Sequence, residues 1–167
     1  DLPHMALQFS GNDFLIEGCW FHRSCRNPQQ MGAIYARLGD QPHMRGTVIR
    51  GNLFQDIGRW VEEPGGAIYL ADGTMGVRIS DNVFHRVGSG KKSRAIFIDG
   101  GAHVMVENNT FIDCPVPLRL EFTPSVNGSS ERMAAWRILL TADSTRKHLL
   151  RYRQLADFFG EDRAFPD

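Results

Sequence analysis

The sequence lacks an excess of charge of either sign, because 19 basic residues balance 19 acidic ones. A chain without net charge has no overall field that would draw it to nucleic acid or to an anionic membrane. It also lacks an apolar run long enough to span a bilayer. We therefore expect no nucleic acid and no membrane among its partners.

Cysteine and helical periodicity are scarce as well. The three cysteines, Cys19, Cys25 and Cys114, are an odd number and do not have the spacing of a metal site. We interpret them as small buried thiols. Helical periodicity is absent until about residue 130, which indicates β-structure for most of the chain.

The sequence does contain one short pattern in four copies: an aliphatic residue, two mostly polar positions, Asn or Cys, any residue, and Phe. The copies are Ile16–Phe21, Ile49–Phe54, Ile79–Phe84 and Val106–Phe111. Their Phe residues are 33, 30 and 27 residues apart. Self-similarity at such a spacing indicates a stacked, repetitive architecture.

A second short apolar strand follows each copy after a variable loop. These strands are residues 33–36, 67–70, 95–98 and 117–120. Both kinds of strand are short, rich in β-branched or aromatic residues, and bounded by Gly, Asn, Asp or Pro. Two strands and two or three turns in about 30 residues favour a coil of parallel strands over a propeller blade, which needs four strands.

The repeated Asn and Phe positions predict two ladders along the stack. Asn52, Asn82 and Asn109 lie at a turn, where each amide can cap its own turn and bond the coils on either side, about 4.8 Å away. The Phe side chains would stack inward and fill the core. We interpret both ladders as structural.

The character of the chain changes after residue 129. Ser130 and Ser144 each precede a helical pattern of apolar residues. We expect these helices to pack against the side of the stack, and a partner-binding helix is the alternative. The sequence thus predicts β-helix rungs over residues 9–122 and a helical appendage over residues 123–167.

Neither end of the sequence has the pattern that is expected at the end of a solenoid. The first residues lack a signal peptide pattern, and the first repeat starts almost at once, at residues 12–16. Terminal repeats of a solenoid normally carry caps. We therefore expect an internal part of a longer protein, whose remaining rungs pack against this one.

The strand–turn–Asn–x–Phe repeats resemble the right-handed parallel β-helix repeat of pectate-lyase-like proteins, over about residues 10–122. Residues 66–73 with 82–84, and 95–101 with 107–114, are similar to large secreted bacterial β-helix proteins, many of which act on polysaccharides. The resemblance implies an all-β, right-handed parallel β-helix solenoid of about four rungs. It also implies an extracellular or periplasmic location and a polysaccharide or oligosaccharide partner.

In such proteins the substrate groove usually runs along the outer face of one sheet, which we take to be the sheet of the second strands. Side-chain alternation assigns the two faces of that sheet. The inward column is Ile34, Ile68, Ile96 and Leu118, with Leu70, Ile98 and Leu120 beside it. The first outward column is Tyr35, Tyr69, Phe97 and Arg119. The next is Arg37, Ala71, Asp99 and Glu121.

An outward aromatic column beside charged groups suits a sugar-binding groove. Aromatic faces stack on pyranose rings, and charged groups bond hydroxyls or uronate carboxylates. The predicted sugar-binding residues are Tyr35, Tyr69, Phe97, Asp72, Arg37 and Trp60. The alternative is that the stacked rings only cover the sheet, beneath a loop or the C-terminal helices.

Asp99 and Glu121 are expected on adjacent rungs, with backbones about 4.8 Å apart. Such a pair suits a retaining glycosidase, a shared Ca²⁺ ion, or a site in which one carboxylate keeps a proton and acts as general acid. Asp72 would lie close enough to join it. The alternative is two solvated acids at strand ends, one of them paired with Arg119 or Arg37. Arg119 is the candidate for neutralising a uronate or for acting near a proton-abstraction site.

The expected function is part of a secreted, carbohydrate-active protein, either a glycoside hydrolase or a polysaccharide lyase. Its catalytic residues would be Asp99, Glu121 and Arg119, with Asp99 and Glu121 also the candidate Ca²⁺ ligands. The rival is a non-catalytic segment: carbohydrate-binding, adhesin or spacer rungs of a larger β-helix protein. Fold alone does not decide between them.

Overall fold

The chain forms parallel β-sheets in every part that the structure describes. The computed structural model describes residues 5–25, 32–36, 44–58, 66–71, 74–90, 93–101 and 103–121. All regular elements of these residues are short strands, and every strand pair is parallel. No helix occurs among the described residues, so none there is able to cross a membrane. The helices predicted over residues 123–167 lie outside them.

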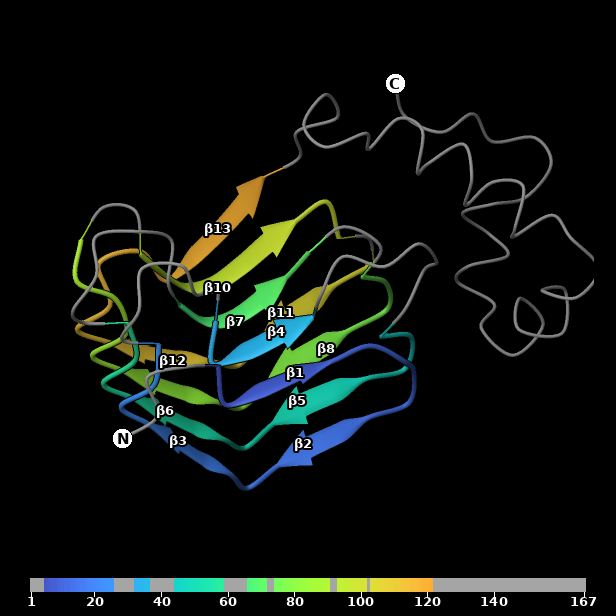
Figure 1. Ribbon diagram of the computed structural model, residues 1–167, viewed down its shortest axis with the longest axis horizontal. Coiled ribbons are helices and arrows are strands. Elements are labelled where there is room, and N and C mark those ends of the chain that lie inside the picture. The colour runs from blue at the N-terminus through green and yellow to red at the C-terminus, as the bar shows by residue number, and fades with distance from the viewer. Residues whose placement is uncertain are drawn as a thin grey trace, which may run out of the picture.

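The strands belong to three sheets that enclose one core (Figure 1). Sheet A consists of β1 (Leu7–Phe9), β4 (Ile34–Ala36), β7 (Gly66–Leu70), β10 (Arg94–Asp99) and β13 (Leu118–Glu121). Sheet B consists of β2 (Leu15–Glu17), β5 (Val48–Arg50), β8 (Arg78–Ser80) and β11 (Met105–Glu107). Sheet C consists of β3 (Trp20–His22), β6 (Leu53–Gln55), β9 (Val83–His85) and β12 (Thr110–Ile112).

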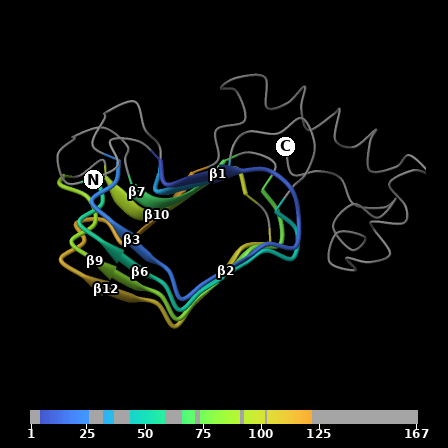
Figure 2. The same cartoon turned by 60° about the horizontal axis from the view of Figure 1, so that its bottom comes forward.

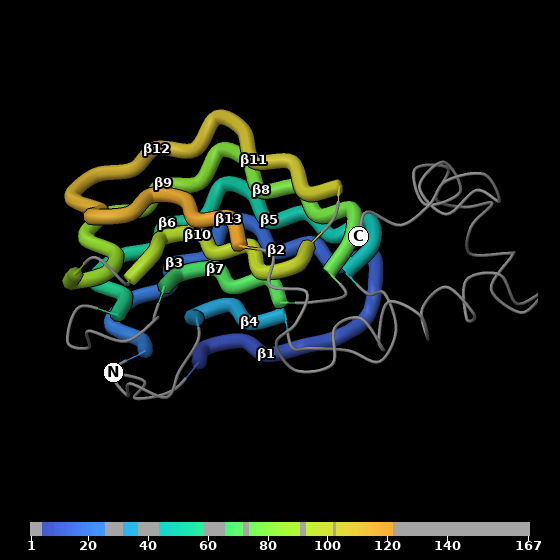
Figure 3. The backbone as a smooth tube through the Cα atoms, turned by 90° about the horizontal axis from the view of Figure 1, so that it is seen from above, coloured from blue at the N-terminus to red at the C-terminus, as the bar shows by residue number. Residues whose placement is uncertain are grey.

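Each coil of the chain contributes one strand to each sheet in the order B, C, A, and the next coil repeats the order. In a view close to the axis of the coils, sheets B and C meet at a sharp bend and sheet A lies opposite them (Figure 2). Seen from above, successive coils lie side by side in sequence order (Figure 3). This is the arrangement of a parallel β-helix, as the spacing of the repeats predicts.

Each coil has three strands, whereas the sequence pattern predicted two. The aliphatic–Asn–x–Phe pattern spans a strand of sheet B, a bend, and a strand of sheet C. The bend residue has a positive φ in all four coils: Gly18 (63°), Gly51 (61°), Asp81 (57°) and Asn108 (52°). Gly, Asp and Asn are the residues that adopt this left-handed conformation most readily. A bend of two residues carries too little loop signal to separate two strands in the sequence.

The two other corners of each coil also use left-handed residues. Positive φ recurs before sheet B at Asp13, Gly46, Gly76 and His103. It recurs after sheet C at Arg23, Asp56, Arg86 and Asp113. Left-handed residues therefore recur at corresponding corners of all four coils.

The predicted asparagine ladder is confirmed. Asn52 accepts a hydrogen bond at Oδ1 from the Cys19 amide, 2.9 Å away, and donates through Nδ2 to the Ile16 carbonyl and to Asn82 Oδ1, both at 2.9 Å. Asn82 repeats the arrangement with Asn109. Each amide therefore satisfies the polar backbone at the bend of its neighbour, which a buried bend requires.

The predicted phenylalanine ladder is confirmed too. The rings of Phe21, Phe54, Phe84 and Phe111 stack with centroids 4.8 to 4.9 Å apart and interplanar angles of 5° to 10°. Phe54 and Phe84 are fully buried. The ladder packs with the fully buried Ile49 and Ile79 of sheet B and the inward isoleucines of sheet A in one core.

Candidate functional site

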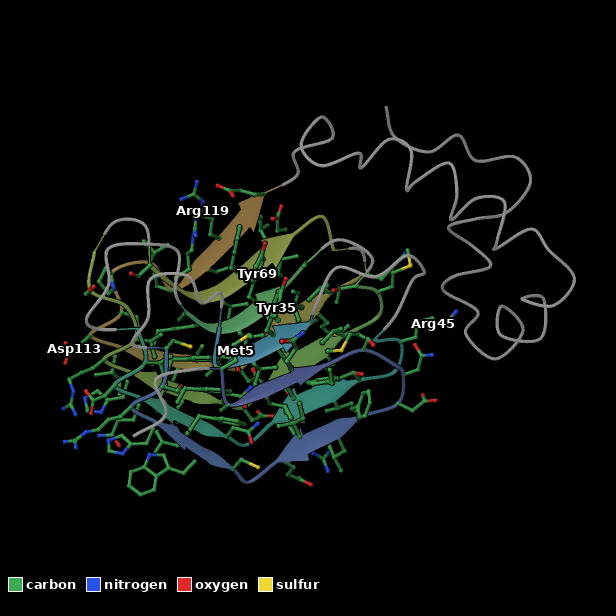
Figure 4. All side chains as sticks on the ribbon, in the orientation of Figure 1. Met5, Tyr35, Arg45, Tyr69, Asp113 and Arg119 are labelled. Atoms are coloured by element: carbon green, nitrogen blue, oxygen red, sulfur yellow. The ribbon has the colours of Figure 1, made fainter. Side chains whose placement is uncertain are left out.

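The register of sheet A sets the candidate site, and it is the register that alternation predicts. Tyr35 pairs with Tyr69, Tyr69 with Phe97, and Phe97 with Arg119. Asp99 pairs with Glu121. Tyr35, Tyr69 and Arg119 mark β4, β7 and β13 of this sheet in Figure 4.

The inward side of the same strands forms the core, with one exception at its end. Ile34, Ile68 and Ile96 are fully buried, as predicted. Leu118 and Leu120 are in register with Ile96 and Ile98 but are 40 % and 67 % exposed. β13 is the last strand of sheet A in the described part of the chain, so no described strand covers their far side.

The outward aromatic column is a second stack of rings. Tyr35 and Tyr69 stack at 5.2 Å, and Tyr69 and Phe97 at 4.7 Å. Tyr69 is only 8 % exposed and Phe97 only 7 %. Because each ring of the column covers a face of its neighbour, Tyr69 has no open face, and a pyranose would meet it at its edge.

The far face of Phe97 is covered by an arginine that was not among the predicted site residues. The Arg94 guanidinium carbon lies 4.2 Å from the centre of the Phe97 ring. Since the Tyr69 ring occupies one face of Phe97, Arg94 occupies the other. The aromatic column therefore ends on a cation, an arrangement that the ring quadrupole favours.

The Arg94 side chain is buried, and only part of its hydrogen-bonding capacity is used. It is 6 % exposed, and its Nε and Nη1 atoms are buried without a hydrogen-bond partner. Its Nη2 atom lies 3.9 Å from Glu121 Oε1. Burial first, and the charge of Arg119 second, lower the pKa of Arg94 from its ordinary value, while Glu121 raises it. An arginine nevertheless stays protonated, so a positive charge is held against sheet A.

Alternation explains why the sequence did not single out Arg94. It begins β10 and has the parity of the inward residues Ile96 and Ile98. At the first residue of a strand the side chain is able to leave the alternation and turn over the outer face. Its partner on β7 is Gly66, where a Cβ would collide with the Arg94 carbonyl, so the two backbones approach closely at this point.

Both carboxylates of the site have a partner. The Tyr69 hydroxyl donates a hydrogen bond of 2.9 Å to Asp99 Oδ2. Glu121 forms an ion pair with Arg119, its neighbour two residues away on β13. Two arginines, two carboxylates and a tyrosine hydroxyl thus meet at β7, β10 and β13.

Three of the predicted sugar-binding residues lie outside the described residues: Arg37, Trp60 and Asp72. In the described part of the chain, no group of three or more His, Cys, Asp or Glu side chains is arranged to hold a metal ion. Asp99 and Glu121 would therefore supply the carboxylates of the expected Ca²⁺ site, and further oxygens would be needed to complete its usual six to eight ligands.

A second polar ladder lies at the corner after sheet C. Arg86 forms a two-pronged ion pair with Asp56, with both N···O distances 2.7 Å, and His22 Nε2 lies 3.5 Å from the same carboxylate. The hydrogen bond from Arg86 is the largest cause that lowers the pKa of Asp56, to about 2. His22 and His85 lie in the same column, with Gln55 between them.

Burial accounts for the behaviour of two cysteines. Cys25 is fully buried, and burial raises the pKa of its thiol to about 11. Burial also raises the pKa of Cys114, which is half-buried. Cys19 is exposed, contrary to the prediction that all three thiols are buried.

A scan against protein-family models, a search of curated proteins and a search of solved structures each gave no match.

Proposed function

We propose that the chain is part of a secreted, carbohydrate-active β-helix protein of the pectate-lyase-like type that cleaves polysaccharide, as a glycoside hydrolase or a polysaccharide lyase. Its β-helix would be right-handed, the sense of nearly all crossover connections between parallel strands. An extracellular or periplasmic location follows from the same resemblance.

One observation carries the proposal: Asp99 and Glu121 are paired residues on the outer face of β10 and β13. Neighbouring strands hold two such backbones about 4.8 Å apart. Their carboxylates have different partners, because Tyr69 donates a neutral hydrogen bond to Asp99 while Arg119 pairs with Glu121. Two carboxylates in different surroundings are what acid and base roles in glycoside cleavage require.

The proposed roles follow from these contacts. Asp99 and Glu121 act as acid and base, or together bind Ca²⁺ in a lyase. Arg119 is 40 % exposed at its side chain and would bind an acidic group of the substrate. Tyr35, Tyr69 and Phe97 would contact sugar through their edges and the hydroxyls of the tyrosines.

A second function class is favoured by the burial of the aromatic column. Rings that are 8 % and 7 % exposed, with their faces stacked on each other, also suit rungs that only support or bind, without catalysis. Such rungs would be carbohydrate-binding, adhesin or spacer rungs of a larger β-helix protein, and all three would be compatible with buried, stacked rings.

The test uses the full chain against neutral and uronate-rich polysaccharides, with Ca²⁺ and with chelator. New reducing ends report any cleavage, and unsaturated uronide absorbance reports a lyase. Asp99→Asn and Glu121→Gln should each lower turnover by about 100-fold or more, the usual contribution of a general acid or base.

Glu107→Gln is the matched control, because Glu107 also pairs with an arginine, Arg78, but on sheet B. It should leave turnover unchanged. Turnover that survives both Asp99→Asn and Glu121→Gln would refute the assignment. Binding without turnover would support the non-catalytic class instead.

A further inference from the structure

The outer face of sheet C differs from those of the other two sheets because it carries no charged side chain. The outer face of sheet B carries two ion pairs, one of them between Arg78 and Glu107, and that of sheet A carries the paired Asp99 and Glu121. None of the outward side chains in the four described strands of sheet C is Asp, Glu, Lys or Arg. They are Trp20, Leu53, Val83 and Thr110 in one column, and His22, Gln55, His85 and Ile112 in the next.

Trp20 is the most exposed aromatic residue in the described part of the chain, at 63 %. One face of its indole ring lies on the imidazole of His22, with ring centroids 4.9 Å apart and planes 22° from parallel. Since most of the residue is nevertheless exposed, the opposite face of the indole is open to solvent. Such a ring offers a large, flat apolar surface to a ligand.

Contacts behind this ring pair fix its orientation. His22 Nε2 lies 3.5 Å from Asp56 Oδ2, and Asp56 is held by Arg86 through two hydrogen bonds of 2.7 Å. Side chains that are held in place before binding lose less conformational entropy when a ligand binds. The Trp20 platform is therefore preorganised.

The two outward columns of sheet C offer two kinds of contact at the same spacing. Trp20 and the next two residues of its column are apolar. The column beside it supplies one hydrogen-bonding side chain in each of the first three coils: His22, Gln55 and His85. Successive coils lie about 4.8 Å apart. A saccharide has apolar C–H faces and hydroxyl edges along its length, so one neutral chain would contact both columns.

The size of this face favours a small ligand over a protein partner. Its strands have three residues each and four coils contribute to it, so the face measures roughly 10 Å by 20 Å, or about 200 Å². A stable protein interface covers about 800 Å² of each partner. A short oligosaccharide fits the smaller area.

We propose that the outer face of sheet C is a second binding site, with Trp20 as its platform, and that its ligand is a neutral saccharide chain. The site lies on a different sheet from Asp99 and Glu121, so the inference goes beyond the proposed function and does not depend on cleavage. The site would anchor a saccharide rather than cleave it, because the outward side chains of the described strands of sheet C include no carboxylate.

The binding test uses neutral and anionic oligosaccharides side by side. Cellohexaose, mannohexaose, xylohexaose and trigalacturonate are titrated by calorimetry into the full chain, and into its Asp99→Asn variant so that cleavage does not consume the probe. At least one neutral probe should bind, with an affinity that hardly changes with salt, because no charged side chain of the face pairs with it. A change in indole emission that Trp20→Phe removes locates the ligand at this ring.

The variants separate Trp20 from exposed apolar surface in general. Trp20→Ala should weaken binding of the neutral probe by roughly tenfold or more, as the loss of a central Trp usually does. His22→Ala should weaken it less, because the indole remains and only its support is removed. Leu15→Ala is the matched control, since Leu15 lies in the same coil and is 59 % exposed, but on sheet B. It should leave binding unchanged.

A stability measurement excludes unfolding as the cause of lost binding. Substitutions of exposed side chains usually change stability little. The melting temperatures of Trp20→Ala and Leu15→Ala should therefore both stay close to that of the unchanged chain.

The outcomes separate this site from the proposed catalytic one. Binding that Trp20→Ala abolishes and Tyr35→Ala leaves intact supports the site, whether or not the protein cleaves a polysaccharide. Binding that depends on Tyr35 and not on Trp20 would place the saccharide on sheet A and overturn the inference. Cleavage without any binding that depends on Trp20 supports the proposed function and overturns the site.

Two further results would also overturn the inference. One is that no neutral probe binds, or that trigalacturonate alone does. The other is self-association in sedimentation that Trp20→Ala abolishes, because a second copy of the chain would then cover the face.

Discussion

The two aromatic ladders of this protein, one inside the coils and one outside sheet A, have nearly the same geometry and different chemistry. The inner Phe rings stack at 4.8 to 4.9 Å and the outer rings at 4.7 to 5.2 Å. The inner ladder lies in the core. The outer ladder ends at Arg94, and the hydroxyl of its Tyr69 donates a hydrogen bond to Asp99. Stacking therefore follows from strand register, and only the polar groups at the outer ladder indicate a site.

The largest expected difference between the ladders is in stability. Phe84→Ala should lower the free energy of unfolding by about 3–5 kcal/mol, because it leaves a cavity between two stacked rings in the core. Phe97→Ala should cost about 1.5–3 kcal/mol, since its neighbours belong to a smaller cluster beside charged groups. Urea unfolding measures both, and equal losses would contradict the distinction.

The next prediction tests whether the hydrogen bonds of the asparagine ladder stabilise the stack of coils as much as the stacked phenylalanine rings do. Asn82→Ala removes the acceptor of two Asn52 donors and the donor to the Ile49 carbonyl, all buried. We expect a loss of about 2–4 kcal/mol, since each unsatisfied buried group costs about 1–3 kcal/mol. Asn109→Ala, in a half-buried copy, is the matched control and should cost less in the same urea experiment.

A smaller effect separates packing from polarity in the outer ladder. Tyr69→Phe keeps the ring stack and removes the hydroxyl that Asp99 accepts from. Stability should fall by about 0.5–1.5 kcal/mol, the usual net contribution of one hydrogen bond. Under the proposed function, turnover should change far more than stability does. A loss of stability like that of Phe84→Ala would mean that Tyr69 acts as a core residue.

The smallest effect concerns acid stability at the corner after sheet C. The pKa of Asp56 in the folded protein, about 2, lies below its ordinary value of 3.8. The ion pair with Arg86 therefore contributes stability that is complete above about pH 4 and is lost as the pH falls toward 2. Asp56→Asn should flatten this part of a pH–melting curve, while Asp81→Asn, at an exposed bend, should leave it unchanged.

The sequence predicted the fold well because each of its signals repeats. Four aligned copies specify the Ile, Asn and Phe ladders, and alternation then specifies the facing columns of sheet A, including the Asp99–Glu121 pair. A pattern that recurs in every coil gives several copies of the same evidence within one sequence. This is why the ladders could be predicted from one sequence.

Sequence reasoning missed two kinds of feature: contacts that occur only once, and a strand that recurs in every coil. Arg94 breaks the alternation at the first residue of a strand, and its burial depends on tertiary packing. The short bend between sheets B and C hid the third strand of each coil. The Asp56–Arg86 pair joins residues in different coils, which only the register brings together. The polar chemistry of the outer face depends on such single contacts.

The asparagine ladder also gives the stack a weakest joint. The first coil meets the second through two bonds of this ladder, from the Cys19 amide to Asn52 and from Asn52 to Ile16, because Cys19 has no side-chain amide. The second coil meets the third through three, two from Asn52 to Asn82 and one from Asn82 to Ile49. Under a pulling force along the axis, the coil that contains Cys19 should peel away first, at a lower force than the coils that follow it.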